Sequence, residues 1–239
     1  MATSNNEKLA VLIDADNAQA SIIHELLAEV SRYGMASVKR AYGDWTTTNL
    51  KGWKDVLHKM AIQPMQQFSY TTGKNSTDSS LIIDAMDLLH SGSLNGFCLV
   101  SSDSDFTRLA TRIREAGLVV YGFGERKTPQ PFVAACDKFI YTEILKPQQA
   151  PAPQDGQELE PVEPMIRTAV TATARDNGWA ALSAVGAMLL KNSPSFDPRN
   201  YGCQKLGELV RKQTYLEVKE VSVGDGSTNV HLYVRLKSA

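Results

Sequence analysis

The chain of 239 residues contains aspartates whose positions indicate metal-ion chemistry. Asp103 and Asp105 lie two residues apart directly after the apolar run 97–100, and Asp14 directly follows the apolar run 9–13. A short, continuous apolar run is typical of a buried parallel strand. Ligands of open α/β sheets bind outside the carboxyl ends of such strands. If these two strands are neighbours, we expect the three aspartates to face each other at one edge of the sheet.

Asp78 would join this cluster from the start of the helix that precedes the second of these strands. Carboxylates so close together repel each other unless a proton or a metal ion lies between them. Carboxylates, waters and substrate phosphates are the usual ligands of Mg²⁺ or Mn²⁺, and a bound ion neutralises a phosphodiester and supplies a hydroxide. Each acid also has a simpler interpretation, since Asp14 and Asp105 could cap helices and Asp78 would suit the dipole of a first helical turn. Three helix caps at one edge need not all be aspartate, so a metal-binding cluster is the preferred hypothesis.

The elements that must position these acids alternate between apolar strands and amphipathic helices. Helices are expected over 22–34, 48–60, from residue 78, over 106–116 and over 129–135. Strands are expected over 9–13, 37–42, 62–68, 97–100 and 118–123, with a last short strand or turn over 139–145. Pro64 argues for an edge position of the third strand, because proline cannot donate to a ladder. The alternation predicts an α/β fold, a three-layer α/β/α domain with a parallel sheet, over residues 1–146.

A second, smaller domain is expected after a linker rich in Pro, Gln and Glu at residues 147–163, because such a composition cannot bury a core. Residues 164–239 carry 10 Lys+Arg and 6 Asp+Glu, a net charge of +4. Their pattern predicts helices over 165–175, 182–190 and 201–212, and two strands, 216–223 and 230–236, joined by a glycine-containing turn at 224–227. Three helices followed by a β-hairpin make a winged helix-turn-helix domain.

Composition restricts the cellular setting. No apolar run approaches the roughly 20 residues of a membrane span, so no membrane partner is expected. The first eight residues contain no apolar region of a signal peptide, so we expect a cytoplasmic protein. Cys98, Cys136 and Cys203 form no CxxC pair and are interpreted as reduced core thiols.

Three motifs in order resemble those of the NYN domain, a PIN-like nuclease family, in its LabA-like branch. They are Leu12-Ile13-Asp14-Ala15-Asp16-Asn17, Lys74-Asn75-Ser76-Thr77-Asp78 with Asp84, and Val100-Ser101-Ser102-Asp103-Ser104-Asp105-Phe106. The resemblance implies a PIN-like fold and metal-dependent cleavage of RNA. It also implies the catalytic and metal-binding acids, Asp14, Asp78, Asp103 and Asp105. Asn17 would orient substrate or water, and Ser102 would lie beside the metal. Asp84 matches a frequent acid of the family, although a purely structural role on its helix is an equal alternative.

Substrate contacts would come from loops at the same edge of the sheet. Lys74 lies in a polar loop and could contact a phosphate, and Trp45 lies in another polar loop and could stack a base. Further cations near the cleft are Lys39, Arg40, Arg108, Arg112, Arg126 and Lys127, and further aromatic candidates are Tyr42, Tyr70 and Phe123. For each aromatic residue, ordinary packing is the competing interpretation.

The C-terminal part resembles a LOTUS (OST-HTH) domain. The matching residues are Gly178-Trp179-Ala180-Ala181-Leu182-Ser183, 196–202 (Phe-Asp-Pro-Arg-Asn-Tyr-Gly), and Lys205-Leu206 with Leu209-Val210. The resemblance implies binding of RNA or docking of a protein partner. Trp179, Phe196, Tyr201 and Leu206 are expected in the core, and the candidates for phosphate contact are Lys205, Arg211, Lys212 and Arg235.

These patterns favour a divalent-metal-dependent ribonuclease that hydrolyses RNA phosphodiesters. The alternative is a non-catalytic RNA-binding adaptor with a dormant site. A haloacid-dehalogenase phosphatase would have Thr or Val at position 18, where this chain has Ala18, and a receiver domain would end its third strand in Asp rather than in Phe68-Ser69. An α/β sheet with open edges also permits a homodimer.

Overall fold

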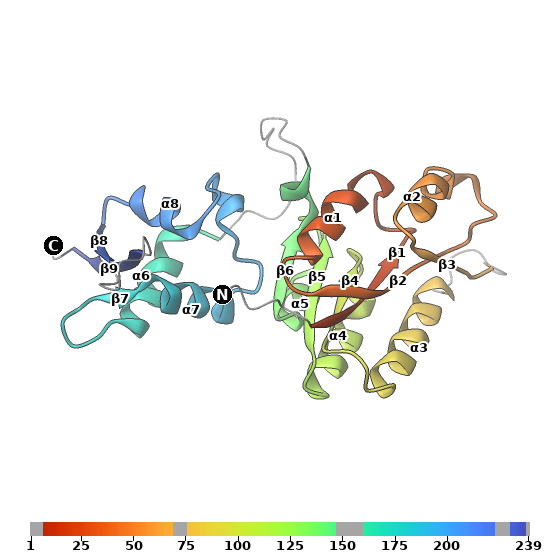
Figure 1. Ribbon diagram of the computed structural model, residues 1–239, viewed down its shortest axis with the longest axis horizontal. Helices are drawn as coiled ribbons and strands as arrows, with labels where there is room; N and C mark the ends of the chain where they lie inside the picture. Colours follow the sequence, from red (N-terminus) through yellow and green to blue (C-terminus); the bar gives the residue numbers. More distant parts are fainter. Residues whose placement is uncertain (1–6, 69–75, 147–159, 223–229, 238–239) are drawn as a thin grey trace. The chain divides into compact units, whose positions relative to one another are not determined.

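The structure, a computed structural model, describes residues 7–68, 76–146, 160–222 and 230–237. The chain divides into two compact units, Met1–Gly156 and Gln157–Ala239. Figure 1 shows a sheet with flanking helices in the first unit and a group of helices with a small sheet in the second. Among the described helices, none is both long and apolar enough to cross a bilayer.

The first unit is built on a sheet of six parallel strands in the order β3-β2-β1-β4-β5-β6. The strands are β1 (Lys8–Asp14), β2 (Met35–Gly43), β3 (Gln63–Gln66), β4 (Gly96–Val100), β5 (Val119–Gly124) and β6 (Lys138–Tyr141). Strands β1 and β4 are neighbours, with Ile13 opposite Val100, as the clustering of the acids requires. Successive strands are added on one side of β1 up to β3 and on the other side from β4 onward. The boundary between β1 and β4 is therefore the topological switch point, where such sheets bind ligands.

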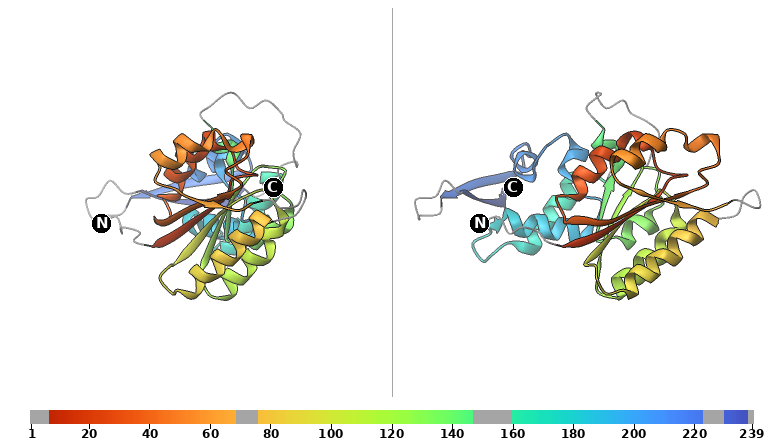
Figure 2. Two further views of the ribbon diagram at one scale, coloured as in Figure 1. Left: turned by 90° about the vertical axis from the view of Figure 1, so that its right-hand side faces the viewer. Right: turned by 45° about the vertical axis from the view of Figure 1, so that its right-hand side comes forward.

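Helices cover both faces of this sheet, which confirms the expected three-layer α/β/α fold (Figures 1 and 2). One face carries α1 (Ile23–Val30) and α2 (Trp53–Lys59), and the other carries α3 (Ser76–His90) and α4 (Thr107–Glu115), with α5 (Gln130–Ala135) packed on α4. Short 3-10 turns complete the unit: η1 (Ala20–Ile22), η2 (Thr48–Leu50), η3 (Ser104–Phe106) and η4 (Thr142–Leu145). Pro64 lies on the edge strand β3, as its missing donor predicts.

The alternation of side chains along β1 decides which face of the sheet Asp14 occupies. Leu9, Val11 and Ile13 of β1 pack in one core with residues of α1 and α2. Because successive side chains of a strand point to opposite faces, Leu12 and Asp14 face the layer that contains α3 and α4. Asp14 thus ends β1 on the side from which α3 contacts the strand.

The second unit contains α6 (Val162–Thr173), α7 (Leu182–Asn192), the 3-10 turn η5 (Pro198–Tyr201) and α8 (Leu206–Arg211). The unit also contains an antiparallel sheet in the order β7-β9-β8, which consists of β7 (Ala180–Ala181), β8 (Leu216–Ser222) and β9 (Val230–Leu236). The hydrophobic core lies between the helices and this sheet and includes Ile166, Val170, Val185, Leu189, Val210 and Val234. The strand β7 was not predicted, and the expected turn at 224–227 lies outside the described residues.

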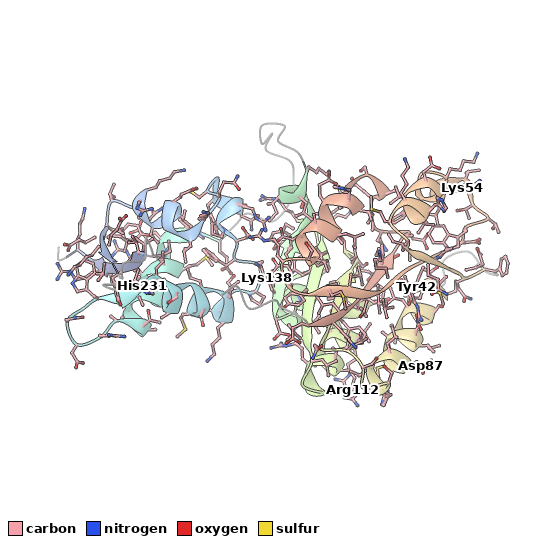
Figure 3. All side chains as sticks on the ribbon, in the orientation of Figure 1. Tyr42, Lys54, Asp87, Arg112, Lys138 and His231 are labelled. Carbon is pink, nitrogen blue, oxygen red and sulfur yellow. The ribbon has the colours of Figure 1, made fainter. Side chains whose placement is uncertain are left out.

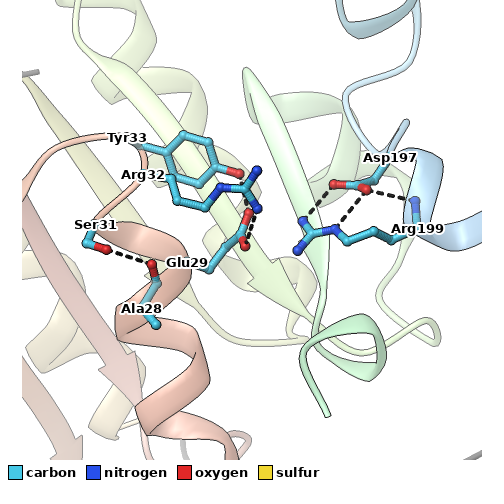
Figure 4. A network of polar contacts seen from close by, with 7 residues as sticks. All are labelled: Ala28, Glu29, Ser31, Arg32, Tyr33, Asp197 and Arg199. Atoms are coloured by element: carbon cyan, nitrogen blue, oxygen red, sulfur yellow. Dashed lines mark hydrogen bonds and ion pairs between the residues drawn. The ribbon is translucent and has the colours of Figure 1, made fainter. Parts of the chain in front are cut away.

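The predicted helix over 201–212 is wrong in its first half. Asp197 accepts a hydrogen bond from the backbone N–H of Arg199 at 2.9 Å, and the Arg199 guanidinium pairs with the same carboxylate at 2.9 and 2.8 Å (Figure 4). This contact fixes the 3-10 turn η5. Gly202 then adopts a left-handed conformation, φ +70°, which ends the turn, so the helix begins only at Leu206.

Gly122 on β5 tests how tightly the backbone of β5 packs against the side chains of Phe139 on β6 and of Cys136, the residue after α5. A Cβ at this position would overlap the ring of Phe139 and lie 2.7 Å from Cys136 Sγ. We expect Gly122→Ala to destabilise the first unit by about 1–3 kcal/mol, the usual cost of overpacking. Urea unfolding measures this loss of stability in a Trp179→Phe background, where the remaining tryptophans, Trp45 and Trp53, both lie in the first unit.

The matched control is Gly52→Ala. This glycine has ordinary helical dihedral angles, φ −66°, and no atom lies within 4 Å of its added Cβ. It should be neutral or stabilising by up to about 1 kcal/mol, and equal losses for both variants would contradict the packing argument.

Candidate functional site

Asp14, the last residue of β1, is a buried carboxylate held by three donors. Its Oδ2 accepts hydrogen bonds from Asn17 Nδ2 at 2.7 Å and from Ser101 Oγ at 2.8 Å. Its Oδ1 accepts from the backbone N–H of Asp16 at 3.2 Å. Burial raises the pKa of Asp14, and the hydrogen bonds from Asn17 and Ser101 only partly counteract that rise. A carboxyl group in such a position indicates a role beyond packing, because burying a carboxylate is costly.

The turn after β4 orients Asp103 and Asp105. Ser101 Oγ accepts from the backbone N–H of Asp103 at 3.1 Å, and Asp103 Oδ1 accepts from the N–H of Asp105 at 2.9 Å. Asp103 is therefore the N-cap of η3, a role that the sequence had suggested for Asp105. One serine thus connects the acids of two neighbouring strands.

Three of the expected acids meet closely enough to share an ion. One carboxylate oxygen from each of Asp78, Asp103 and Asp105 lies within 4.8 Å of the others. Asp78 comes from the first turn of α3, and the other two come from the β4–α4 connection. Asp14 is outside this group of three but is close enough to affect Asp78 electrostatically.

The pKa of Asp78 is raised to about 6, first by burial and then by the negative charges of Asp14, Asp103, Asp105 and Asp16. Like charges disfavour the ionised form of a carboxyl group. The site therefore concentrates negative charge, which is the condition that a divalent cation with oxygen ligands relieves. The carboxylate donor set fits Mg²⁺ or Mn²⁺ better than a soft metal, because hard cations prefer oxygen ligands.

Helix α3 is fastened to the sheet by a second acid. Asp84 forms an ion pair with Arg40 and accepts a hydrogen bond from the Tyr42 hydroxyl, both from β2. Burial raises the pKa of Tyr42 far above its usual range, so this hydroxyl stays a proton donor. Asp84 thus engages both of its oxygens within the protein, which supports the structural interpretation of this residue.

The structure changes several expected substrate contacts. Arg40 is paired with Asp84, and Lys39 Nζ donates to the Met60 carbonyl at 2.5 Å. Lys127 Nζ pairs with Glu125 at 2.7 Å. Arg108 is exposed and Arg112 is half-buried on α4 (Figure 3 labels Arg112), and the half-buried Arg126 has its guanidinium 6.0 Å from the centroid of the Tyr141 ring. Phosphate contact by these three arginines stays a prediction. Lys74 and Tyr70 lie outside the described residues.

Two aromatic stacking predictions are wrong, because Tyr42 and Phe123 are fully buried. Trp45 is half-buried, lies edge-on to Trp53 with ring centroids 6.3 Å apart, and donates from Nε1 to the Met65 carbonyl at 3.1 Å. This ring is held in place with part of its surface accessible, so base stacking at Trp45 stays a prediction.

Ser101 is a residue of the candidate site that the sequence did not single out. Ser102 was expected beside the metal, and that role stays a prediction; its Oγ accepts a hydrogen bond from the backbone N–H of Glu125 at 2.9 Å. Ser102 and Asn17 also line a cavity of about 10 Å³, about the volume that one water needs. The position of Ser101 in the sequence could have indicated this role, because it is the first residue after β4 and therefore lies beside the end of β1.

Fold and site together define a PIN-like α/β domain with an acidic centre at its switch point. The model of the NYN domain matches residues 8–145, and the model of the OST-HTH/LOTUS domain matches residues 157–228. The first match spans more than half of the chain, which therefore belongs to the NYN family and carries a LOTUS domain after the NYN domain.

Solved structures provide further similarities. A crystal structure of a protein of unknown function from Vibrio parahaemolyticus is 20% identical, with a TM-score of 0.48, and the match covers 58% of this chain and 94% of that one. A solution structure of residues 175–257 of a Chromobacterium violaceum protein is 45% identical (TM-score 0.27, 34% and 84% covered). An uncharacterized protein from Nitrosomonas europaea is 36% identical (TM-score 0.30, 39% and 89% covered). No curated protein matches the sequence.

Asp78→Asn should stabilise the metal-free protein at neutral pH. The folded state binds the Asp78 proton more tightly than the unfolded state does, since the pKa rises from 3.8 to about 6. This tighter proton binding by Asp78 therefore stabilises the folded state fully below about pH 4, and the stabilisation is lost as the pH rises through about 6. Asparagine carries no such charge, so the variant should gain about 1–2 kcal/mol above pH 7, a value reduced for the partial solvent exposure of the group.

Denaturant titrations in EDTA at several pH values between about 4 and 8, a range that spans the two pKa values, measure this difference in stability. Asp87→Asn is the control, because Asp87 is an exposed carboxylate further along α3 (Figure 3). If Asp78→Asn raised the free energy of unfolding equally at every pH, or if Asp87→Asn raised it as much, the unfavourable ionisation of Asp78 in the folded state would be contradicted.

Proposed function

We propose that this protein is a divalent-metal-dependent ribonuclease, in which the NYN domain hydrolyses RNA phosphodiesters and the LOTUS domain binds RNA. The observation that carries the proposal is the meeting of Asp78, Asp103 and Asp105 within 4.8 Å, beside Asp14. Membership of the NYN family supports the nuclease assignment, and the LOTUS domain supports an RNA ligand. The cytoplasmic location, the LabA-like branch, the homodimer and the domain boundaries stay predictions.

Asp78, Asp103 and Asp105 would hold the ion, Mg²⁺ or Mn²⁺, with Asp14 completing its surroundings. When bound, the ion would neutralise charge on the phosphodiester and lower the pKa of a water. The chain itself supplies the positioning. Ser101 and Asn17 hold the Asp14 carboxylate, and the ion pair of Asp84 with Arg40 holds the helix that carries Asp78.

RNA would be held around this centre by cations that contact its phosphates and by an aromatic ring that stacks on a base. Arg108 and Arg112 lie on α4, the helix that follows Asp103 and Asp105 in the chain, and their guanidinium groups are suited to phosphates. The accessible part of Trp45 is suited to a base. Asn17 is exposed at the rim while its amide donates to Asp14, so it is placed to orient substrate or water, and Lys74 is a further expected phosphate contact.

Metal binding is testable without measuring turnover. We expect Mn²⁺ at about 100 times its Kd to raise the melting temperature of the wild-type protein by about 5–10 °C. Asp103→Asn should abolish most of this shift, because it removes one of the three clustered carboxylates, while Asp87→Asn should keep it. Differential scanning calorimetry with and without EDTA provides the measurement, and an equal shift in Asp103→Asn would argue against the proposed ion site.

RNA cleavage tests the reaction itself. Purified wild-type protein should cleave a labelled RNA in Mg²⁺ or Mn²⁺ and lose that activity in EDTA. Asp103→Asn should reduce the rate at least about 100-fold, in line with the loss of a metal-dependent electrostatic contribution, and Asp87→Asn should stay near wild type. Activity that survives EDTA or Asp103→Asn would exclude this mechanism. Tight, metal-independent RNA binding without cleavage would favour the non-catalytic adaptor.

A further inference from the structure

The sheet of the second unit has two chemically different faces. Leu216, Val218, Val234 and Leu236 belong to the hydrophobic core or pack against it. The residues between them alternate to the opposite face. This outer sheet face consists of the cross-strand pairs Glu217–Arg235, Lys219–Tyr233 and Val221–His231. Figure 3 labels His231 on β9.

Trp179 extends this face from the residue before β7. Its ring is half-buried, and the prediction that it lies in the core is wrong. The Arg235 guanidinium lies 4.7 Å from the ring centroid, and Lys219 Nζ lies 6.0 Å from it. Arg235 is oriented in turn by Glu217, to which its Nε and Nη2 donate at 3.2 and 2.5 Å.

The outer sheet face therefore combines flat groups with cations. Trp179, Tyr233 and the Arg235 guanidinium offer planar surfaces on which bases stack, and Lys219 and His231 are exposed. Proteins that bind single-stranded RNA use this combination. The core of a protein–protein interface is instead depleted of charge and largely apolar. Among the described residues of this face, Val221, 38% exposed, is the large aliphatic side chain that solvent reaches.

The cations expected on the helical side are less suited to an RNA strand. Arg211 is paired with Glu220, and Lys212 Nζ lies 3.4 Å from the Gly202 carbonyl. Arg235 has an acid partner too, Glu217, so the difference lies in the ring: in the described part of the chain Lys219 and Arg235 lie over Trp179, whereas Arg211 and Lys212 lie over no aromatic ring.

We propose that the outer sheet face of the LOTUS domain binds single-stranded RNA, with a base stacked against the Trp179–Arg235 pair and a phosphate beside Lys219. The inference rests on the proposed function in that RNA is the ligand of this domain. It does not depend on cleavage.

Binding is measured on the full chain carrying Asp103→Asn, in EDTA, by fluorescence anisotropy of a labelled oligouridine of roughly 12 nucleotides. Trp179→Ala should weaken binding roughly 5–100-fold, as expected for loss of one stacked base, while Trp179→Phe should keep most of the affinity. Lys219→Gln with Arg235→Gln should weaken it at least about 10-fold and reduce the salt slope by about 0.7, from the loss of the one phosphate contact, that of Lys219, on a single strand.

Lys205→Gln with Lys212→Gln is the matched control, because it removes the same charge from the helical side. Its affinity should stay within about twofold of that of the parent, and its salt slope should be unchanged, because these two lysines contact no phosphate in the proposed complex. Circular dichroism checks that each variant is folded, and the variant with Lys219→Gln and Arg235→Gln keeps the test decisive if Trp179→Ala unfolds.

Three outcomes would overturn the proposal: loss of binding in the helical-side control but not in the sheet variants, equal binding by Trp179→Ala, or no binding of oligouridine by the parent, which would leave a protein partner as the ligand. Normal binding by a protein that never cleaves RNA would refute the nuclease and support the outer sheet face. Normal cleavage without oligouridine binding would do the reverse.

Discussion

The parallel pairing of β1 with β4 is the contact on which the rest of the first unit depends. It brings Asp14 beside the turn that carries Asp103, and Ser101 then connects the two through one hydroxyl. The carboxylates gathered at this edge repel each other, and this repulsion adds to the effect of burial, the larger cause, in raising the pKa of Asp78. An arrangement that costs folding free energy without a ligand is typical of a functional site rather than of a structural one.

The position of Asp78 depends on a second polar group deeper in the same layer. Asp84 is bound by Arg40 and Tyr42, so α3 is tied to β2 as well as packed on the sheet. Removing one partner of such a pair would leave a poorly solvated charge, which is strongly destabilising. The helix therefore combines an acid that serves the fold with an acid that serves the site, six positions apart.

Much of the fold could be predicted, because local patterns carried it. Continuous apolar runs marked the central strands β1, β4 and β5, and the missing N–H of Pro64 marked the edge strand β3. The helix predicted from residue 201 failed where Asp197 and Arg199 stabilise a competing turn. The roles of Tyr42, Phe123 and Trp179 were also misjudged, since whether an aromatic ring is buried depends on which face of which sheet it occupies.

By itself the sequence determined the alternation of strands and helices, the acids at the ends of β1 and β4, and the two families whose motifs it contains. Only the tertiary structure decided that Asp78 lies with Asp103 and Asp105, that Ser101 rather than Ser102 supports Asp14, and that Arg40 is committed to Asp84. The physical reason is range. Propensity and periodicity act over a few neighbouring residues, whereas carboxylate repulsion, ion pairing and burial depend on distances between segments that only the folded chain brings together.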